Sequence, residues 1–174
     1  MLSKFLKMRK YFCTLIILYL FSIGCHFDSN IHCLKFANKY RNEDFTQFTN
    51  IGLAIRCYCK EGITTYISDK LDSKERRYPY MVIFNEGEES IKKTTCTMLK
   101  DSCAFDTIKL NKLALIFLKY HVEKLSVDKD NNVFIGIGSS EGANLVRFSD
   151  NKYVKDEYKK DWYSLDDNWY VKKD

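Results

Sequence analysis

One segment of the sequence has the spacing of a serine nucleophile. Gly138-Ser139-Ser140-Glu141-Gly142 fits the pattern Gly-x-Ser-x-Gly, in which a serine on a sharp strand-to-helix turn is activated by a histidine that follows it in the chain. A strand-like run precedes Gly138, but no histidine lies after His121, and the residues beyond Gly142 alternate as a strand does. The pattern therefore favours a hairpin turn over a hydrolase nucleophile.

A second segment has the carboxylate spacing of a calcium loop. Asp128, Asp130 and Asn132 occupy alternate positions, as the first ligands of an EF-hand loop do, but that loop also requires glycine at its sixth position and glutamate at its twelfth. Val133 and Ser139 stand at those positions. The chain's histidines have no zinc-ligand spacing either. We therefore interpret the segment as a turn and predict neither a metal nor a cofactor.

Paired carboxylates are a third possible chemistry, and they leave no local signature. Two acids need only come within roughly 5 to 10 Å of each other in the folded chain. Such a site would be a concave pocket that holds two acids with raised pKa values. The acids available for it include Glu86, Glu88, Glu89 and Glu141.

The first 24 residues have the features of an export signal. Met8-Arg9-Lys10 is a basic head, so that either Met1 or Met8 can serve as the start, and residues 11–23 form an uncharged, mostly apolar run. As a helix this run covers roughly 20 Å, well short of the roughly 30 Å hydrocarbon core of a bilayer. A cleaved secretory signal, whose apolar region has about 7 to 15 residues, fits better than a membrane span.

Ser22-Ile23-Gly24-Cys25 ends this run and resembles the lipobox of bacterial lipoproteins, with Ser22 at the position where leucine is usual. The resemblance implies that Cys25 is acylated and becomes the first residue of the mature chain. Each buried methylene of such an anchor contributes about 0.8 kcal/mol. His26, rather than Asp, follows the cysteine, which implies the outer membrane where the cell has one. An ordinary signal peptide and a secreted or periplasmic protein are the alternative.

Removal of the signal leaves residues 25–174, the size of one ordinary domain. The signal holds four of the 28 basic residues and no acid, so the remainder carries 24 basic residues against 23 acidic ones. Nucleic-acid binding needs a basic face or stripe. The near-neutral mature chain therefore gives no sequence argument for a nucleic-acid partner.

Five cysteines remain after the signal and the anchor: Cys33, Cys57, Cys59, Cys96 and Cys103. An exported chain meets an oxidising environment, so we expect disulfides and at least one remaining thiol. Cys96 and Cys103 are the predicted pair because they bracket a polar segment, and closing a loop of about 8 residues gives roughly 2.5 kcal/mol. The alternative is that these cysteines are small buried hydrophobes.

The elements that position these residues form, by prediction, an α+β domain. We expect an antiparallel sheet of about five to seven strands, with one main helix packed across it and a short helix at the N-terminus. The short helix covers residues 29–40, where Ile31, Leu34 and Ala37 recur at helical spacing. The main helix covers residues 106–126 and is capped by Asp106. Its apolar stripe is Leu110, Leu113, Ala114, Phe117, His121 and Leu125.

Strands are predicted where apolar residues alternate or run together between turn signals. Residues 53–68 form a hairpin, in which a three-residue turn, Lys60-Glu61-Gly62, opposes Cys59 to Ile63 and aligns the two apolar rows. Residues 91–99 fit a strand, an irregular segment or a helical turn, with a strand or an irregular segment favoured. The other predicted strands are residues 80–84, 133–138, 143–148 and 169–172. The last of them is expected near the edge of the sheet.

The C-terminal tail supplies the candidate binding residues, Trp162, Tyr163, Trp169 and Tyr170. Exposed tryptophan and tyrosine are typical anchors of protein interfaces, although the same rings could belong to the core. With no catalytic constellation in view, we expect a non-enzymatic binding or inhibitory module, attached to a membrane of the cell envelope through Cys25 and facing a protein partner. The alternatives are an envelope hydrolase with paired carboxylates and a purely structural envelope lipoprotein.

Overall fold

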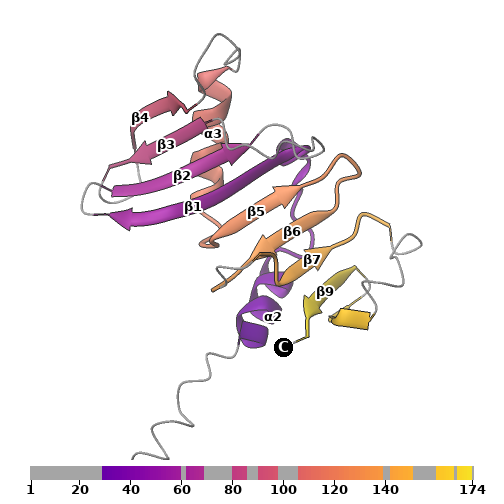
Figure 1. Cartoon of the computed structure of the whole chain (residues 1–174). Helices are drawn as coiled ribbons and strands as arrows, with labels where there is room; N and C mark the ends of the chain where they lie inside the picture. The colour runs from indigo at the N-terminus through magenta and orange to yellow at the C-terminus, as the bar shows by residue number, and fades with distance from the viewer. Residues whose placement is uncertain are drawn as a thin grey trace, which may run out of the picture.

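The computed structural model describes residues 29–59, 62–68, 80–85, 90–97, 106–138, 142–150, 160–166 and 168–173 (Figure 1). Two α-helices and a 3₁₀ turn accompany the strands: α2 (Ser29–Lys39), η1 (Thr46–Phe48) and α3 (Thr107–Leu118). The strands are β1 (Ile51–Cys59), β2 (Gly62–Ser68), β3 (Tyr80–Phe84), β4 (Ile91–Cys96), β5 (Lys124–Val127), β6 (Val133–Gly136), β7 (Leu145–Arg147), β8 (Trp162–Ser164) and β9 (Trp169–Lys172). No helix within these ranges is both long and apolar enough to span a bilayer.

The strands form one antiparallel sheet in the order β4-β3-β2-β1-β5-β6-β7-β9-β8. The prediction of an α+β domain with five to seven strands and one main helix is therefore wrong. The described residues hold nine strands and only two short α-helices, which is closer to an all-β fold. The sequence pattern missed β5, which lies where the main helix was expected to continue, and β8, which is the edge strand beyond β9.

α3 ends at Leu118 because the chain tightens and then turns. The backbone N–H groups of Lys119, Tyr120 and His121 donate to carbonyls three residues earlier, at 3.1 to 3.2 Å. His121 has φ 52°, the left-handed conformation that typically stops a helix. It is exposed, so it is not part of the buried stripe that the sequence predicted.

The first part of the predicted main helix is confirmed. Asp106 caps it, because its Oδ1 accepts hydrogen bonds from the N–H groups of Ile108 at 2.8 Å and Lys109 at 3.4 Å. The apolar residues predicted to face the sheet are buried there: Leu110, Leu113, Ala114 and Phe117.

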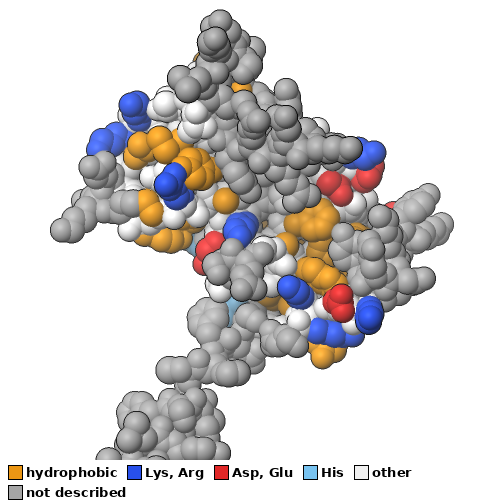
Figure 2. Space-filling view, viewed as in Figure 1, with side chains coloured by type: hydrophobic (Ala, Val, Ile, Leu, Met, Phe, Trp, Pro, Cys, Tyr) orange, Lys and Arg blue, Asp and Glu red, His pale blue; other side chains and the backbone are white. Residues whose placement is uncertain are grey.

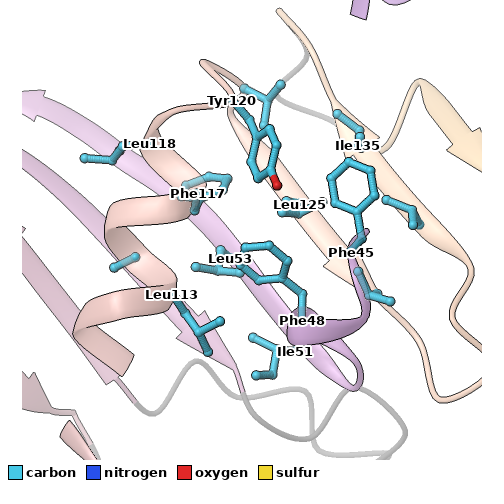
Figure 3. Close-up of a cluster of buried hydrophobic side chains, with 14 of the residues drawn as sticks. Phe45, Phe48, Ile51, Leu53, Leu113, Phe117, Leu118, Tyr120, Leu125 and Ile135 are labelled. Atoms are coloured by element: carbon cyan, nitrogen blue, oxygen red, sulfur yellow. The ribbon is translucent and has the colours of Figure 1, made fainter. Parts of the chain in front are cut away.

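One row of buried side chains crosses the sheet on the face that the helices cover. Register places the row along β3, β2, β1, β5, β6, β7 and β9, in the order Tyr80, Ile67, Leu53, Leu125, Ile135, Leu145 and Val171. Figure 3 shows Leu53, Leu125 and Ile135 beside Phe117 of α3 and Phe48 of η1. Because a slip of one residue would turn this row to the other face, its burial fixes the register of the strands.

α2 is a helix as predicted, but of its predicted apolar stripe only Ala37 is buried, at 2% exposed. Ile31 and Leu34 are 48% and 45% exposed, whereas Cys33 and Phe36 are buried at 0% and 7%. The Phe36 ring lies with its centroid 6.2 Å from that of Trp169 on β9. The larger aromatic side chain therefore takes the position against the sheet, and the aliphatic pair is left outside.

The β1–β2 hairpin is confirmed, but its predicted three-residue turn is wrong. Cys59 lies opposite Gly62, so the connection consists of positions 60 and 61 alone. An irregularity between Ile55 and Cys57 inserts an extra residue into β1. This bulge changes the pairing by one residue, which aligns the buried rows of the two strands as the longer turn would have done.

Replacing Gly62 by alanine is expected to destabilise the fold more than the same change at Gly142. Gly62 has φ +116°, and a Cβ there would lie 1.8 Å from the Phe84 carbonyl oxygen; Gly142 has φ +148°, with no atom within 4 Å of such a Cβ. Backbone strain alone costs about 1 to 3 kcal/mol, and a clash adds about 1 to 3 kcal/mol. Urea denaturation followed by circular dichroism gives both free energies of unfolding. Equal losses would show that the Phe84 carbonyl does not limit this position.

Candidate functional site

The predicted binding aromatics divide between the two faces of the sheet. Trp169 is 1% exposed, which places it in the core and leaves it no surface for a partner. Trp162 and Tyr170 are half-buried on the opposite face, where they pack against Val146 and Phe148. Tyr163 is 55% exposed, but the Lys173 ammonium lies 5.2 Å from its ring centroid. Most of the aromatic tail is therefore core, on both sides of the sheet.

Of the cysteines predicted for lipidation and for a disulfide, only Cys96 lies within the described residues. Cys25 and Cys103 lie outside the described residues, so acylation and the Cys96–Cys103 pair stay predictions. Cys57 and Cys96 are both disulfide-bonded. They lie on β1 and β4, three strands apart, or roughly 14 Å at about 4.8 Å per strand, whereas bridged Cα atoms lie within about 7 Å. They therefore belong to two different disulfides. Cys33 is a buried thiol.

The Gly-x-Ser-x-Gly segment lies in the connection between β6 and β7, which are neighbouring antiparallel strands. The Asn144 side chain holds the base of this hairpin: its Nδ2 donates to the Ile137 carbonyl at 2.8 Å, and its Oδ1 accepts from the Ile137 N–H at 2.9 Å. Gly142 leads directly towards β7 rather than into a helix. The interpretation as a hairpin turn is confirmed, with residues 139–141 outside the described ranges.

The calcium-like segment is also a turn, as predicted. Asp128 Oδ1 accepts from the N–H groups of Asp130 at 2.9 Å and Asn132 at 2.8 Å, and its Oδ2 accepts from Asn132 Nδ2 at 2.8 Å. Across the described ranges, no three histidine, cysteine, aspartate or glutamate side chains gather in a way that could hold a metal ion. The acids considered for paired-carboxylate chemistry lie outside those ranges: Glu86, Glu88, Glu89 and Glu141.

A charged cluster lies where the segment between α2 and β1 crosses the sheet. Arg147 of β7 places its guanidinium carbon 4.8 Å from the Phe45 ring centroid and 5.5 Å from that of Trp169. Its Nη1 donates to the Glu43 backbone carbonyl at 2.8 Å. Burial lowers the pKa of Arg147, and the negative charges of Asp44 and Glu43 oppose that shift. Arg147 therefore stays cationic and fixes the position of this segment.

Tyr120 is the second polar member of this cluster. Its hydroxyl donates to Glu43 Oε1 at 3.0 Å, and its ring packs against Phe45 and Phe48 with centroids 5.3 and 6.2 Å away. Burial, followed by the bond to Glu43, raises the pKa of Tyr120. Nearby, the Thr46 N–H donates to Asp44 and holds the pKa of that carboxyl below its usual value. These groups bond to one another, so the cluster is suited to holding the segment rather than to chemistry.

A shallow, open hollow lies along one side of α3. The hollow has a volume of about 560 Å³, and its described lining comes from α3 and the residue that follows it: Ile108, Asn111, Lys112, Leu115, Ile116 and Lys119. We call these six residues the α3 surface. Ile108 is 79% exposed, while Leu115 and Ile116 are half-buried. Asn111 Oδ1 accepts from Thr94 Oγ1 at 2.6 Å, which fastens this side of the helix to β4.

The charge on the α3 surface is of one sign. Lys112 and Lys119 are exposed beside the apolar side chains, and α3 contains no acidic residue. The apolar stripe predicted for this helix excluded Lys112 and Lys119, but the sequence pattern did not identify Ile108 as exposed. The available signal was that α3 carries more apolar residues than one buried stripe requires, which is typical of a helix with a second contact.

Comparison of this chain with protein-family models, with curated proteins and with solved structures found no match. The function is therefore argued from the α3 surface and the sequence alone.

Tyr120→Phe is expected to lower the free energy of unfolding at pH 7 by about 1 to 2 kcal/mol, because the bond to the Glu43 carboxylate is lost. The ordinary pKa of tyrosine is 10.0 and the folded value is higher. The stabilisation is therefore complete below pH 10 and declines as the pH rises towards the folded pKa. Above pH 10 the difference in free energy of unfolding between wild type and Tyr120→Phe should therefore become smaller.

Urea denaturation across the range from pH 7 to about 11.5 measures this difference. Tyr163→Phe, at an exposed position, is the control and should stay within about 0.5 kcal/mol of wild type. A difference that is constant with pH would mean that Tyr120 ionises equally in the folded and unfolded chain.

Proposed function

We propose that this chain is a membrane-anchored binding or inhibitory module of the bacterial cell envelope, which engages a protein partner through the α3 surface. The observation that carries the proposal is the hollow on α3, where the 79% exposed Ile108 lies beside Lys112. Exposed apolar side chains in a hollow, with charged residues around them, are typical of the centre and rim of a protein interface.

The anchor is supported by the lipobox-like segment that ends at Cys25. The disulfide bonding of Cys57 and Cys96 supports a location in the cell envelope, since disulfides persist in oxidising environments outside the cytosol. An anchored protein also meets its partner close to a surface, where the effective concentration of both is raised.

The chemistry of the α3 surface specifies the partner. Lys112 and Lys119 have no acidic neighbour on α3, so they attract a surface with negative charge. The hollow accepts an apolar side chain between these charges. We therefore expect a protein that presents an apolar residue within an acidic rim.

Cys25→Ser is expected to abolish acylation and to release the mature chain from membranes. The measurement is intact-mass spectrometry of the chain purified from the membrane fraction, in which the wild type should begin at Cys25 and carry the mass of its acyl chains. Cys33→Ser is the matched control, because Cys33 is a buried thiol of the folded domain. A wild-type chain found in the cytosol with Met1 or Met8 in place would contradict the anchor.

A photoreactive phenylalanine analogue in place of Ile108 should cross-link a partner in living cells. The double substitution Lys112→Glu and Lys119→Glu should lower the yield by roughly tenfold or more, because two attractive charge pairs become repulsive. The control carries the same analogue at Lys129, which is exposed in the turn between β5 and β6. A product that survives the charge reversal, or one with twice the mass of this chain, would contradict the proposal.

A further inference from the structure

We infer that α2 is a second contact with the membrane, in which its exposed face lies on an anionic lipid surface beside the anchor. The inference rests on the lipid anchor of the proposed function. It assigns a ligand to residues that the fold leaves uncovered, and it specifies which side of the domain faces the lipid.

The exposed face of α2 combines apolar and cationic side chains. Ile31 and Leu34 are 48% and 45% exposed, and Lys35 and Lys39 are exposed as well. At about 100° per residue, Ile31, Leu34 and Lys35 lie on one side of the helix and Lys39 lies at its border, opposite the buried Phe36. α2 contains no acidic residue. Apolar side chains flanked by lysines are typical of helices that lie in the interface of an anionic membrane.

Chain length places this face near the lipid. Four peptide units join Cys25 to Ser29, the first residue of α2, and they span at most roughly 14 Å when fully extended. The helix itself has 11 residues and is about 16 Å long. An acylated Cys25 at the membrane surface therefore keeps the first turn of α2, with Ile31, within reach of the lipid headgroups.

The position of α2 in the fold agrees with this orientation. α2 contacts β9, towards one end of the sheet, whereas α3 contacts β2 and β4 towards the other end (Figure 1). The exposed face of α2 and the α3 surface therefore lie at different ends of the sheet, so lipid that contacts α2 leaves the residues of the α3 surface uncovered.

The contact is weak by itself and depends on the anchor. Two partly exposed aliphatic side chains bury little area, and each lysine near an anionic surface changes the binding constant by about fivefold. The acyl chains keep the protein bound to the membrane, and the contact of α2 with the lipid then sets the orientation of the domain.

Tryptophan fluorescence on the purified full-length product, in vesicles of phosphatidylethanolamine and phosphatidylglycerol at a ratio of roughly 7:3, tests the inference. Lipids brominated in their acyl chains quench tryptophan that reaches the interface. Leu34→Trp should show quenching above the wild-type background of Trp162 and Trp169. Ile108→Trp on α3, at a 79% exposed position, is the matched control and should show none. Adding Lys35→Glu and Lys39→Glu to Leu34→Trp should lower the docked population by roughly fivefold per lysine.

Intact mass, measured on the same samples, separates failure of the anchor from failure of the α2 contact. An acylated chain in which Leu34→Trp is quenched no more than Ile108→Trp would overturn the α2 contact and leave the anchor standing. A chain without acyl groups that still shows selective quenching would overturn the anchor and support the contact. A chain with neither would overturn both. A further outcome is a blue shift of the Leu34→Trp emission that appears without vesicles and grows with protein concentration. It would show that this face binds a second copy of the chain, and it would overturn the inference.

Discussion

Tyr120 contacts α2 and the segment between α2 and β1, residues 40–50, which lies over the middle of the sheet. It follows α3, and its ring lies 6.3 and 5.0 Å, centroid to centroid, from Phe36 and Tyr40, at the C-terminal part of α2. It also packs against Phe45 and Phe48 in the segment before β1. Residues of the segment between α2 and β1, Phe45 and Phe48, are buried in the same hydrophobic cluster as the helices and the sheet. The aromatic contacts of Tyr120, together with the guanidinium of Arg147, let a nonhelical segment complete the cover.

Because the helices and the segment between α2 and β1 cover the sheet together, the outer sides of the helices remain available for other contacts. Figure 2 shows one side of the molecule, on which apolar, basic and acidic side chains are interspersed. The rigid scaffold below α2 and α3 holds Ile31 and Ile108 outward at the cost of exposed apolar area. Isolated exposed apolar residues are common on proteins. It is their combination with lysines on helices without acids that points to ligands.

Local patterns predicted the features that local interactions determine. The Asp106 cap, the buried stripe from Leu110 to Phe117 and the turn around Asp128 depend on residues a few positions apart. The missed features depend on distant partners. Leu125 suits a helix or a strand equally well, and its pairing with Leu53 and Ile135 makes it a strand. The buried face of α2 and of the aromatic tail is likewise chosen by the contact of Phe36 with Trp169.

Charged residues are unevenly distributed over the fold, so a nearly neutral composition does not mean that each surface is neutral. Residues 25–174 are nearly neutral, with 24 basic residues against 23 acidic ones, yet α2 and α3 carry lysines and no acid. The acids Glu43 and Asp44 lie instead beside Arg147, in the segment that the helices enclose. The α3 surface is therefore locally basic. A nucleic acid would still be a poor ligand for it, because Leu115 and Ile116 lie between Lys112 and Lys119, where phosphates would need contiguous positive charge. An acidic rim around an apolar side chain would match both components of this surface, which is why a protein is the proposed partner.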